Sequence, residues 1–222
     1  MKQTIFITAI DTEIGKTVVT GFLAKYLKDR GGKVITQKII QTGCKGIAED
    51  IKTHREIMGT GLLEVDLNKD TCPMVFELPA SPHLAAALED KEFDQHIWFS
   101  AHQRLLQQYD LVLLEGVGGL FVPLTRDLFL IDWLAQYKFQ TILVTSPRLG
   151  SINHTFLSIE ALQSRSIPLA GMVYNHHVEE DPNITTDTLR LFKEKHPDIP
   201  IVEMPKVKDF NNVIMPDFSV LC

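Results

Sequence analysis

The sequence has few cysteines, and those it has are far apart. Cys44, Cys72 and Cys222 are odd in number and form no Cys-x-x-Cys pair. Structural zinc sites and disulfide frameworks both need closely patterned cysteines, so neither is expected here. This cysteine usage is typical of a reducing compartment, and we expect a cytoplasmic protein.

Long apolar runs and basic clusters are also missing from the sequence. A membrane span needs roughly 18 or more consecutive apolar residues, and no stretch approaches that length. The net charge is −6, and no block or helix is rich in lysine and arginine, which argues against a nucleic-acid partner. The N-terminus enters an apolar run at once and lacks the charged, apolar and small-residue zones of a signal peptide.

What the sequence does contain is a regular alternation of strand-like and helix-like segments. Its 222 residues, 45% of them hydrophobic, are enough for one large domain. Strands are predicted at 4–8, 33–40, 111–114, 141–145, 169–174 and 199–202. Helices are predicted at 18–27, 49–58, 82–88, 95–108, 128–137, 151–164 and 185–195, and 59–80 is predicted to be irregular. This order predicts one α/β domain over residues 1–222, with a doubly wound, mostly parallel sheet covered by helices on both faces. Ligands of such a fold bind at the carboxyl ends of the strands.

Residues 11–17, Asp-Thr-Glu-Ile-Gly-Lys-Thr, carry the strongest functional signal. They follow the apolar run at 4–8 and precede apolar residues at helical spacing, which is the context of a P-loop. In such a loop, backbone N–H groups and the helix N-terminus face the phosphates of a nucleotide. Lys16 would then reach the outer phosphates and Thr17 would bind Mg²⁺. The sequence therefore predicts a nucleotide-binding protein.

The loop departs from the usual P-loop spacing at its start. Ala9 and Ile10 stand where the usual pattern begins with glycine. An alanine costs little while its φ stays negative, but its Cβ limits how closely the turn approaches a phosphate. The segment is therefore a variant P-loop.

A second signal follows the apolar run at 111–114. Glu115 ends that run, and Gly116-Val117-Gly118-Gly119 comes next. An acid in this position can hold Mg²⁺ beside the P-loop threonine, and glycines let the backbone approach a ligand. The alternative is a glycine-rich turn with a solvated glutamate, but a P-loop needs an acidic partner and Glu115 is the best placed.

The residues alone leave two interpretations each for Lys38 and Asp50. Lysine is seldom buried without an anionic partner, so Lys38 either has one or is an edge lysine with a solvated ammonium group. Asp50 begins a predicted helix, where it either supplies a second carboxylate to a metal or is simply favoured by the helix dipole.

The residues alone also leave two interpretations each for two further positions after predicted strands. Residues 149–153, Leu-Gly-Ser-Ile-Asn, open a helix and form either an anion site or a plain loop and cap. Asn175 ends a strand, where it either contacts a base edge or serves as a turn residue.

Taken together, these segments resemble the dethiobiotin synthetase family. The matching segments occur in family order and cover the chain almost end to end. They are 11–17, Lys-Ile-Ile-Gln-Thr-Gly at 38–43, Ser-Pro-His at 81–83, Glu-Gly-Val-Gly-Gly-Leu at 115–120, Leu-Gly-Ser-Ile-Asn-His at 149–154, Gly-Met-Val-Tyr-Asn at 171–175 and Glu-Met-Pro at 203–205. The chain departs from the family in that Ala9 replaces a glycine, Ile39 replaces a proline, and the segment 42–50 is short.

The resemblance implies an ATP- and Mg²⁺-dependent ligase of biotin biosynthesis. In that reaction 7,8-diaminononanoate takes up CO₂ (or bicarbonate) as a carbamate. The carbamate oxygen attacks the γ-phosphoryl group of ATP to give a carbamic-phosphoric anhydride. The second amine then closes the ureido ring of dethiobiotin and expels phosphate. The resemblance also implies a homodimer whose substrate site lies at the subunit interface.

The resemblance further implies roles for particular residues. Lys38 and Lys16 are expected to be catalytic, and Thr17, Asp50 and Glu115 are expected to bind the metal. The residues expected to contact ATP are Thr12, Glu13, Ile14, Gly15, Lys16, Thr17, Val18, Asp50, Glu115, Gly116, Val117, Gly118, Asn175, Met204, Pro205 and Lys206. Those expected to contact the substrate are Lys38, Thr42, Gly118, Leu149, Gly150, Ser151, Ile152 and Asn153.

Other protein classes share parts of this pattern. A partitioning-type ATPase switch carries an extra lysine five positions before the P-loop lysine, where this chain has Asp11. A cobalamin-pathway amidating synthetase needs a glutaminase domain, for which this sequence leaves no room. A small ATP-dependent enzyme that activates another carboxylate or carbamate is the most serious alternative.

Overall fold

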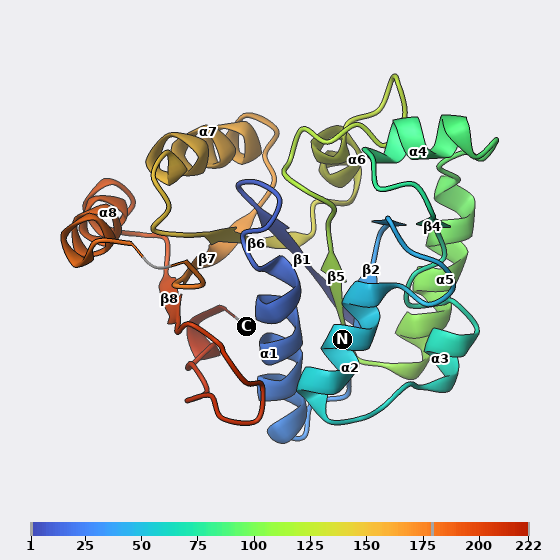
Figure 1. The fold of residues 1–222 in the computed structure, drawn as a ribbon, viewed down its shortest axis with the longest axis horizontal. Helices are drawn as coiled ribbons and strands as arrows, with labels where there is room; N and C mark the ends of the chain where they lie inside the picture. The colour runs from blue at the N-terminus through green and yellow to red at the C-terminus, as the bar shows by residue number, and fades with distance from the viewer. Residues whose placement is uncertain (1, 179, 222) are drawn as a thin grey trace.

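The computed structural model describes residues 2–178 and 180–221, and a parallel β-sheet forms its centre (Figure 1). Within these residues the sheet has six strands in the spatial order β2-β5-β1-β6-β7-β8, and each neighbouring pair is parallel. The strands are β1 (Gln3–Ala9), β2 (Val34–Lys38), β5 (Leu111–Glu115), β6 (Gln140–Thr145), β7 (Leu169–Asn175) and β8 (Ile201–Met204). The predicted α/β fold with a mostly parallel sheet is confirmed.

The remaining elements of the described chain are mostly helices that surround the sheet (Figure 1). They are α1 (Lys16–Asp29), α2 (Glu49–Met58), α3 (Glu64–Leu67), α4 (Pro82–Leu88), α5 (Gln95–Gln108), α6 (Leu130–Tyr137), α7 (Ser151–Ser164) and α8 (Pro182–Lys195). Two short strands, β3 (Gln41–Thr42) and β4 (Val75–Phe76), form a separate small sheet, and Ser219–Leu221 is a 3₁₀ turn. None of the helices in the described residues combines the length and apolar character needed to cross a bilayer.

The helix boundaries predicted at 49–58, 82–88, 95–108 and 151–164 are confirmed. Local chemistry explains the start of α5, because the Asp94 carboxylate accepts hydrogen bonds from the backbone N–H groups of His96 and Ile97. The prediction of one strand over 33–40 is wrong at its end, since β2 stops at Lys38 and the chain turns away to form β3.

The prediction of an irregular segment over 59–80 is also wrong in part, because α3 and β4 lie within it. A tertiary ion pair stabilises α3. Asp66 receives two hydrogen bonds of 2.9 Å from the buried guanidinium of Arg55 on α2, and it also accepts one from the Leu63 backbone N–H. No pattern within residues 59–80 signals that partner.

Alternate residues of β1 serve two hydrophobic cores on opposite faces of the sheet. Ile5 and Ile7 belong to a core that includes α1, whereas Phe6 belongs to a core with Trp98 of α5 and Trp133 of α6. Successive side chains of a strand point to opposite faces, so β1 is covered on both. This burial explains the continuous apolar run that marks the strand in the sequence.

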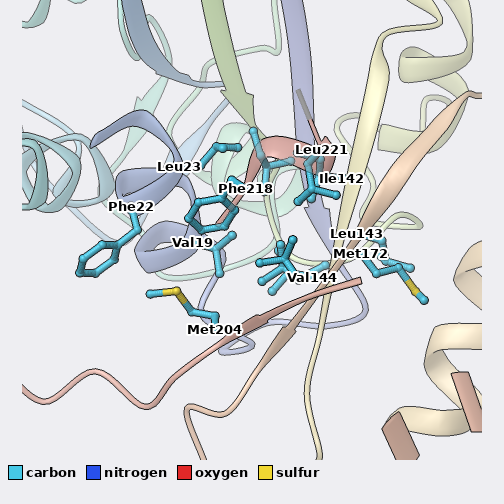
Figure 2. Packing of buried hydrophobic residues seen from close by; sticks show 14 of the residues in the cluster. Val19, Phe22, Leu23, Ile142, Leu143, Val144, Met172, Met204, Phe218 and Leu221 are labelled. Carbon is cyan, nitrogen blue, oxygen red and sulfur yellow. The ribbon is translucent and has the colours of Figure 1, made fainter. Parts of the chain in front are cut away.

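The C-terminal segment completes the first of these cores. In Figure 2, Phe218 lies among side chains of α1, β6, β7 and β8. Phe218 is fully buried, and its ring packs edge-on against Tyr26 of α1 with a centroid distance of 5.5 Å. The Tyr26 hydroxyl also donates a hydrogen bond of 2.5 Å to Asp217. The residues that follow β8 therefore hold α1, the helix after the P-loop, against the sheet.

The carboxyl ends of β1, β2 and β5 lie side by side, and this edge of the sheet positions the candidate site. Lys38 at the end of β2 is in register with Glu115 at the end of β5, and Glu115 is in register with Ile7 of β1. The loop from β1 to α1 begins at the same edge. Residues far apart in the sequence therefore converge where ligands of such folds bind.

Candidate active site

The P-loop, residues 11–17, is held by a residue of β7, two strands away from β1 in the sheet. The side-chain amide of Asn175, at the end of β7, donates a 2.8 Å hydrogen bond to the Ile14 carbonyl and is almost fully buried. Gly15 has φ of 83°, and a Cβ at this position would overlap the Asn175 amide nitrogen. Glycine is therefore required at position 15 both by conformation and by space. Asn175 therefore anchors the loop and is more than a turn residue.

Lys16 begins α1 and is buried, with 7% of its surface exposed. Its ammonium group donates a 3.0 Å hydrogen bond to the Asp11 carbonyl across the loop. Burial, together with repulsion from Lys38, lowers the pKa of Lys16 to about 8. A cation in these surroundings gains strongly from an anionic ligand such as a phosphate.

Glu115 is the centre of a buried polar cluster. One oxygen, Oε1, accepts hydrogen bonds from the Thr17 hydroxyl at 3.1 Å and from the Lys38 ammonium at 2.7 Å. The other oxygen, Oε2, lies 2.8 Å from Nε2 of His54. Burial alone would raise the pKa of the Glu115 carboxyl, but Lys38 and His54 hold that pKa well below its usual range. Glu115 is therefore an ionised carboxylate, and the interpretation as a solvated turn residue is wrong.

Lys38 lies between two carboxylates. Its ammonium group is 2.5 Å from the Asp50 carboxylate and 2.7 Å from Glu115, and it also donates to the Gly116 carbonyl at 2.8 Å. Burial disfavours the charge, but Glu115 and Asp50 raise the pKa of Lys38 above its ordinary value. The interpretation as an edge lysine is wrong, and Asp50 does more than favour the start of its helix.

Helix α2 can deliver Asp50 to this cluster because it packs closely against α1. Gly21 of α1 makes this possible, since a Cβ there would lie 2.7 Å from the side chain of Ile57 on α2. The same helix carries His54, which sequence reasoning missed. Its available signal was its position four residues after Asp50, which places both side chains on one face of the helix.

The donor set at this end of the sheet fits Mg²⁺. Thr17 offers a hydroxyl oxygen, and Glu115 and Asp50 offer carboxylate oxygens, which are the hard ligands this ion prefers. In the described residues, no three His, Cys, Asp or Glu side chains form a compact metal cluster. A magnesium ion held here would thus need further oxygens, and the phosphates of a nucleotide supply them.

The segment 149–153 lies beside the P-loop, because the preceding residue, Arg148, forms an ion pair with Asp11. The guanidinium of Arg148 donates to the Asp11 carboxylate at 2.9 Å, and this contact lowers the pKa of Asp11. Gly150 has φ of 91° and precedes the first residue of α7. The hydroxyl of Ser151 is buried and has no hydrogen-bond partner among the described residues. Around it the segment is mostly open, and Leu149 is 83% exposed.

The other predicted ligand residues differ in their exposure and surroundings. Thr12, Glu13, Val18 and Val117 are exposed or half-buried around the loop, and Thr42 is half-buried in β3. Gly118 has φ of 57°, and a Cβ there would lie 2.7 Å from Val122, so this turn also requires glycine. At the end of β8, Met204 is buried in the core whereas Pro205 and Lys206 are exposed.

A pocket of about 620 Å³ opens next to these elements. Its walls are Asp11 of the P-loop, the loop over residues 119–122 and one face of α7 that includes His154 and Leu157. Its rim includes exposed apolar side chains, since Phe121 is 55% and Leu157 is 57% exposed. Arg165, the residue that follows α7, lies over the Phe121 ring at 5.3 Å from its centroid.

A P-loop with its buried lysine, a hydroxyl–carboxylate pair and a parallel sheet define a P-loop nucleotide-binding protein. Comparison with known proteins agrees, since residues 3–212 match the model of the AAA domain family. The chain is 52% identical over 186 residues to the ATP-dependent dethiobiotin synthetase of Chlorobaculum tepidum, covering 84% of this chain and 78% of that one. It is 48% identical over 199 residues to an ATP-dependent dethiobiotin synthetase of Pasteurella multocida, covering 88% and 93%. The chain belongs to the ATP-dependent dethiobiotin synthetase family.

A solved structure shows the same fold at lower similarity. The nucleotide-binding protein of Archaeoglobus fulgidus, in complex with ADP, superposes with a TM-score of 0.52 over 94% of this chain and 84% of that one, at 16% identity. At this identity the likeness concerns the fold alone.

Proposed function

We propose that this protein is an ATP- and Mg²⁺-dependent cyclo-ligase that converts 7,8-diaminononanoate and CO₂ to dethiobiotin. Membership of the dethiobiotin synthetase family gives the reaction. The observation that carries the proposal is the buried ammonium of Lys38, held at 2.7 Å from Glu115, which also bonds the P-loop threonine. A positive charge in that place suits a second anion next to the nucleotide phosphates, and a carbamate is such an anion.

The residues divide the chemistry between them. Lys16 and the backbone of the loop bind the triphosphate of ATP. Lys38 holds the carbamate so that its oxygen faces the γ-phosphorus, and Thr42 lies on the following strand. Thr17, Glu115 and Asp50 would hold the metal ion, which supplies positive charge to phosphate oxygens during transfer.

The reaction balances in three steps. One amine of the substrate adds to CO₂ and loses a proton, giving the carbamate. A carbamate oxygen then bonds to the γ-phosphorus while the bond to ADP breaks, which gives the mixed anhydride. The second amine attacks the anhydride carbonyl carbon and loses a proton, and inorganic phosphate leaves as the ring closes. Phosphoryl transfer needs mainly positioning and charge neutralisation, which two lysines beside a carboxylate cluster provide.

The adenine contacts at Asn175 and at residues 204–206 are part of the proposal. Asn175 supports it by lying at the base of the P-loop, where it holds Ile14. The exposure of Pro205 and Lys206, next to the buried Met204, leaves this segment accessible to a base. A cytoplasmic location, expected from the cysteine content, is likewise proposed.

We also propose that the protein is a homodimer whose substrate sites are shared between subunits. The exposed apolar residues Phe121 and Leu157, which line the pocket, and Leu149, two residues before α7, support an interface here, because exposed apolar surface of this kind marks contact surfaces. The start of α7, with Gly150 and the unpartnered Ser151 hydroxyl, would then bind the substrate carboxylate from the second subunit.

Mixed dimers test the shared site. Lys38→Ala and Ser151→Glu homodimers should each be inactive, because every site then contains one defect. In a mixed dimer, one site receives both defects and the other receives neither. Random reassortment should therefore recover roughly a quarter of wild-type activity, from half the dimers with one intact site each. No recovery, despite demonstrated subunit exchange, would mean that each chain completes its own site.

The reaction itself is tested by product mass. Wild-type protein is supplied with ATP, Mg²⁺, the diamine and bicarbonate, and both phosphate and the organic product are measured. Phosphate release should depend on the diamine, and the product should have the mass of dethiobiotin. Phosphate release that ignores the diamine would contradict the proposal and favour an ATPase switch.

A further inference from the structure

His54 is a fully buried histidine for which the proposed mechanism has no role. Its Nε2 lies 2.8 Å from Oε2 of Glu115, and the side chain has no measurable exposure. Because an ionised carboxylate only accepts hydrogen bonds, Nε2 is the donor. The other ring nitrogen, Nδ1, has no hydrogen-bond partner among the described residues.

A second buried histidine shows what a purely structural role looks like in this protein. His102 of α5 uses both ring nitrogens, with Nε2 3.0 Å from the Thr4 hydroxyl and Nδ1 2.7 Å from Gln37 Oε1. Its ring is also stacked on Trp98, at a centroid distance of 4.8 Å. Within the described residues, His54 instead leaves one nitrogen without a partner and directs the other at a single carboxylate. Burying a ring nitrogen without a hydrogen-bond partner costs free energy, so the contact with Glu115 is expected to have a function that offsets this cost.

The hydrogen bond from His54 determines the orientation of the Glu115 carboxylate. Oε1 receives Thr17 and Lys38, and Oε2 receives His54, so each oxygen has its own donors. The last torsion of a glutamate side chain is broad, so nothing intrinsic fixes this orientation. If the His54 donor were lost, Oε2 would be buried without a donor, and turned carboxylate positions would become populated.

We propose that His54 is a positioning residue that holds Oε2 of Glu115 and so keeps Oε1 directed at Thr17, where Mg²⁺ and the nucleotide bind. This rests on the proposed function only in taking Glu115 as a ligand of the metal. Helix α2 thereby contributes twice, with Asp50 facing Lys38 and His54 facing Glu115 one turn later. Partners that orient a metal-binding side chain affect metal affinity without touching the metal.

The test measures metal binding apart from turnover. Mn²⁺ is titrated by calorimetry into the full-length chain saturated with ADP, and ADP affinity is measured separately in EDTA. His54→Met keeps the approximate volume and removes the donor, whereas His54→Gln keeps an N–H near the position of Nε2. His102→Met is the matched control, because it also removes a buried, hydrogen-bonded histidine but lies away from Glu115.

His54→Met should weaken Mn²⁺ binding about 10- to 100-fold, with ADP affinity in EDTA unchanged. His54→Gln should recover most of the loss, and His102→Met should bind Mn²⁺ as the wild type does. Wild-type Mn²⁺ affinity in His54→Met would overturn the proposal, as would a His54→Gln variant as weak as His54→Met. An equal loss in His102→Met would also overturn it, because general loosening would then be the cause.

Two further outcomes remain decisive. If His54→Met does not fold, His54→Asn replaces it, since its amide is polar but too short to reach Oε2, and the same loss is expected. If the wild type makes no diamine-dependent product, the proposed reaction fails, yet the Mn²⁺ comparison still decides the role of His54.

Discussion

Acidification should destabilise this fold through one buried histidine, His102. Gln37 Oε1 can only accept, so Nδ1–H of His102 donates to it, and in the neutral ring Nε2 accepts from the Thr4 hydroxyl. Protonation would put a charge in a buried setting next to Trp98 and would reverse the bond with Thr4, so that Nε2–H donates to the hydroxyl. Burial accordingly lowers the pKa of His102 to about 4.

The sign and size of the effect follow from proton linkage. The unfolded chain protonates His102 near the ordinary pKa of about 6.5, whereas the folded chain does so only near 4. Between these values the unfolded state binds more protons, so stability is complete above the unfolded pKa and is lost as the pH falls toward the folded pKa. From about pH 7.5 to about pH 5, His102 should account for a loss of about 2 kcal/mol in the free energy of unfolding.

Urea unfolding at both pH values measures this, with His102→Gln as the reference. Glutamine does not titrate, so carboxylate effects common to both proteins cancel in the difference between their pH dependences. The wild type should lose about 2 kcal/mol more than the variant over this range. Equal losses would show that the buried network accommodates a charged ring and would refute the reasoning.

Two other predictions concern ligands. Lys16→Ala should weaken ATP binding as well as turnover, because Lys16 serves the triphosphate, whereas Lys38→Ala should spare ATP affinity and abolish the chemistry. Calorimetry with ATP on both variants tests this, and equal losses of affinity would contradict the division of roles. Glu115→Gln should raise the Mg²⁺ concentration needed for half-maximal activity substantially, because an amide keeps the shape but removes a charge from the site of a hard cation. A Mg²⁺ titration identical to the wild type would assign Glu115 a purely structural role.

Local sequence determined much of this protein. Helix capping depends on residues within a few positions of the helix start. Asp94 and the Ser81-Pro82 pair therefore predict the starts of α5 and α4 correctly. Alternation of buried strands and helices predicts the α/β class, and Gly15-Lys16-Thr17 after a strand predicts the P-loop. These signals act between residues that are close in the sequence, so they can be recognised without the structure.

Only the tertiary structure decided which partners these residues have. Whether Lys38 is solvated or buried depends on Asp50 and Glu115, which lie 12 and 77 positions away and meet it only when α2 and β5 take their places. In the same way, the role of His54 depends on its hydrogen bond to Glu115, which is distant in the sequence. The ion pair between Asp66 and Arg55 likewise stabilises α3. Parallel strands joined through helices bring distant residues to one edge of the sheet, and no local pattern encodes which strands become neighbours.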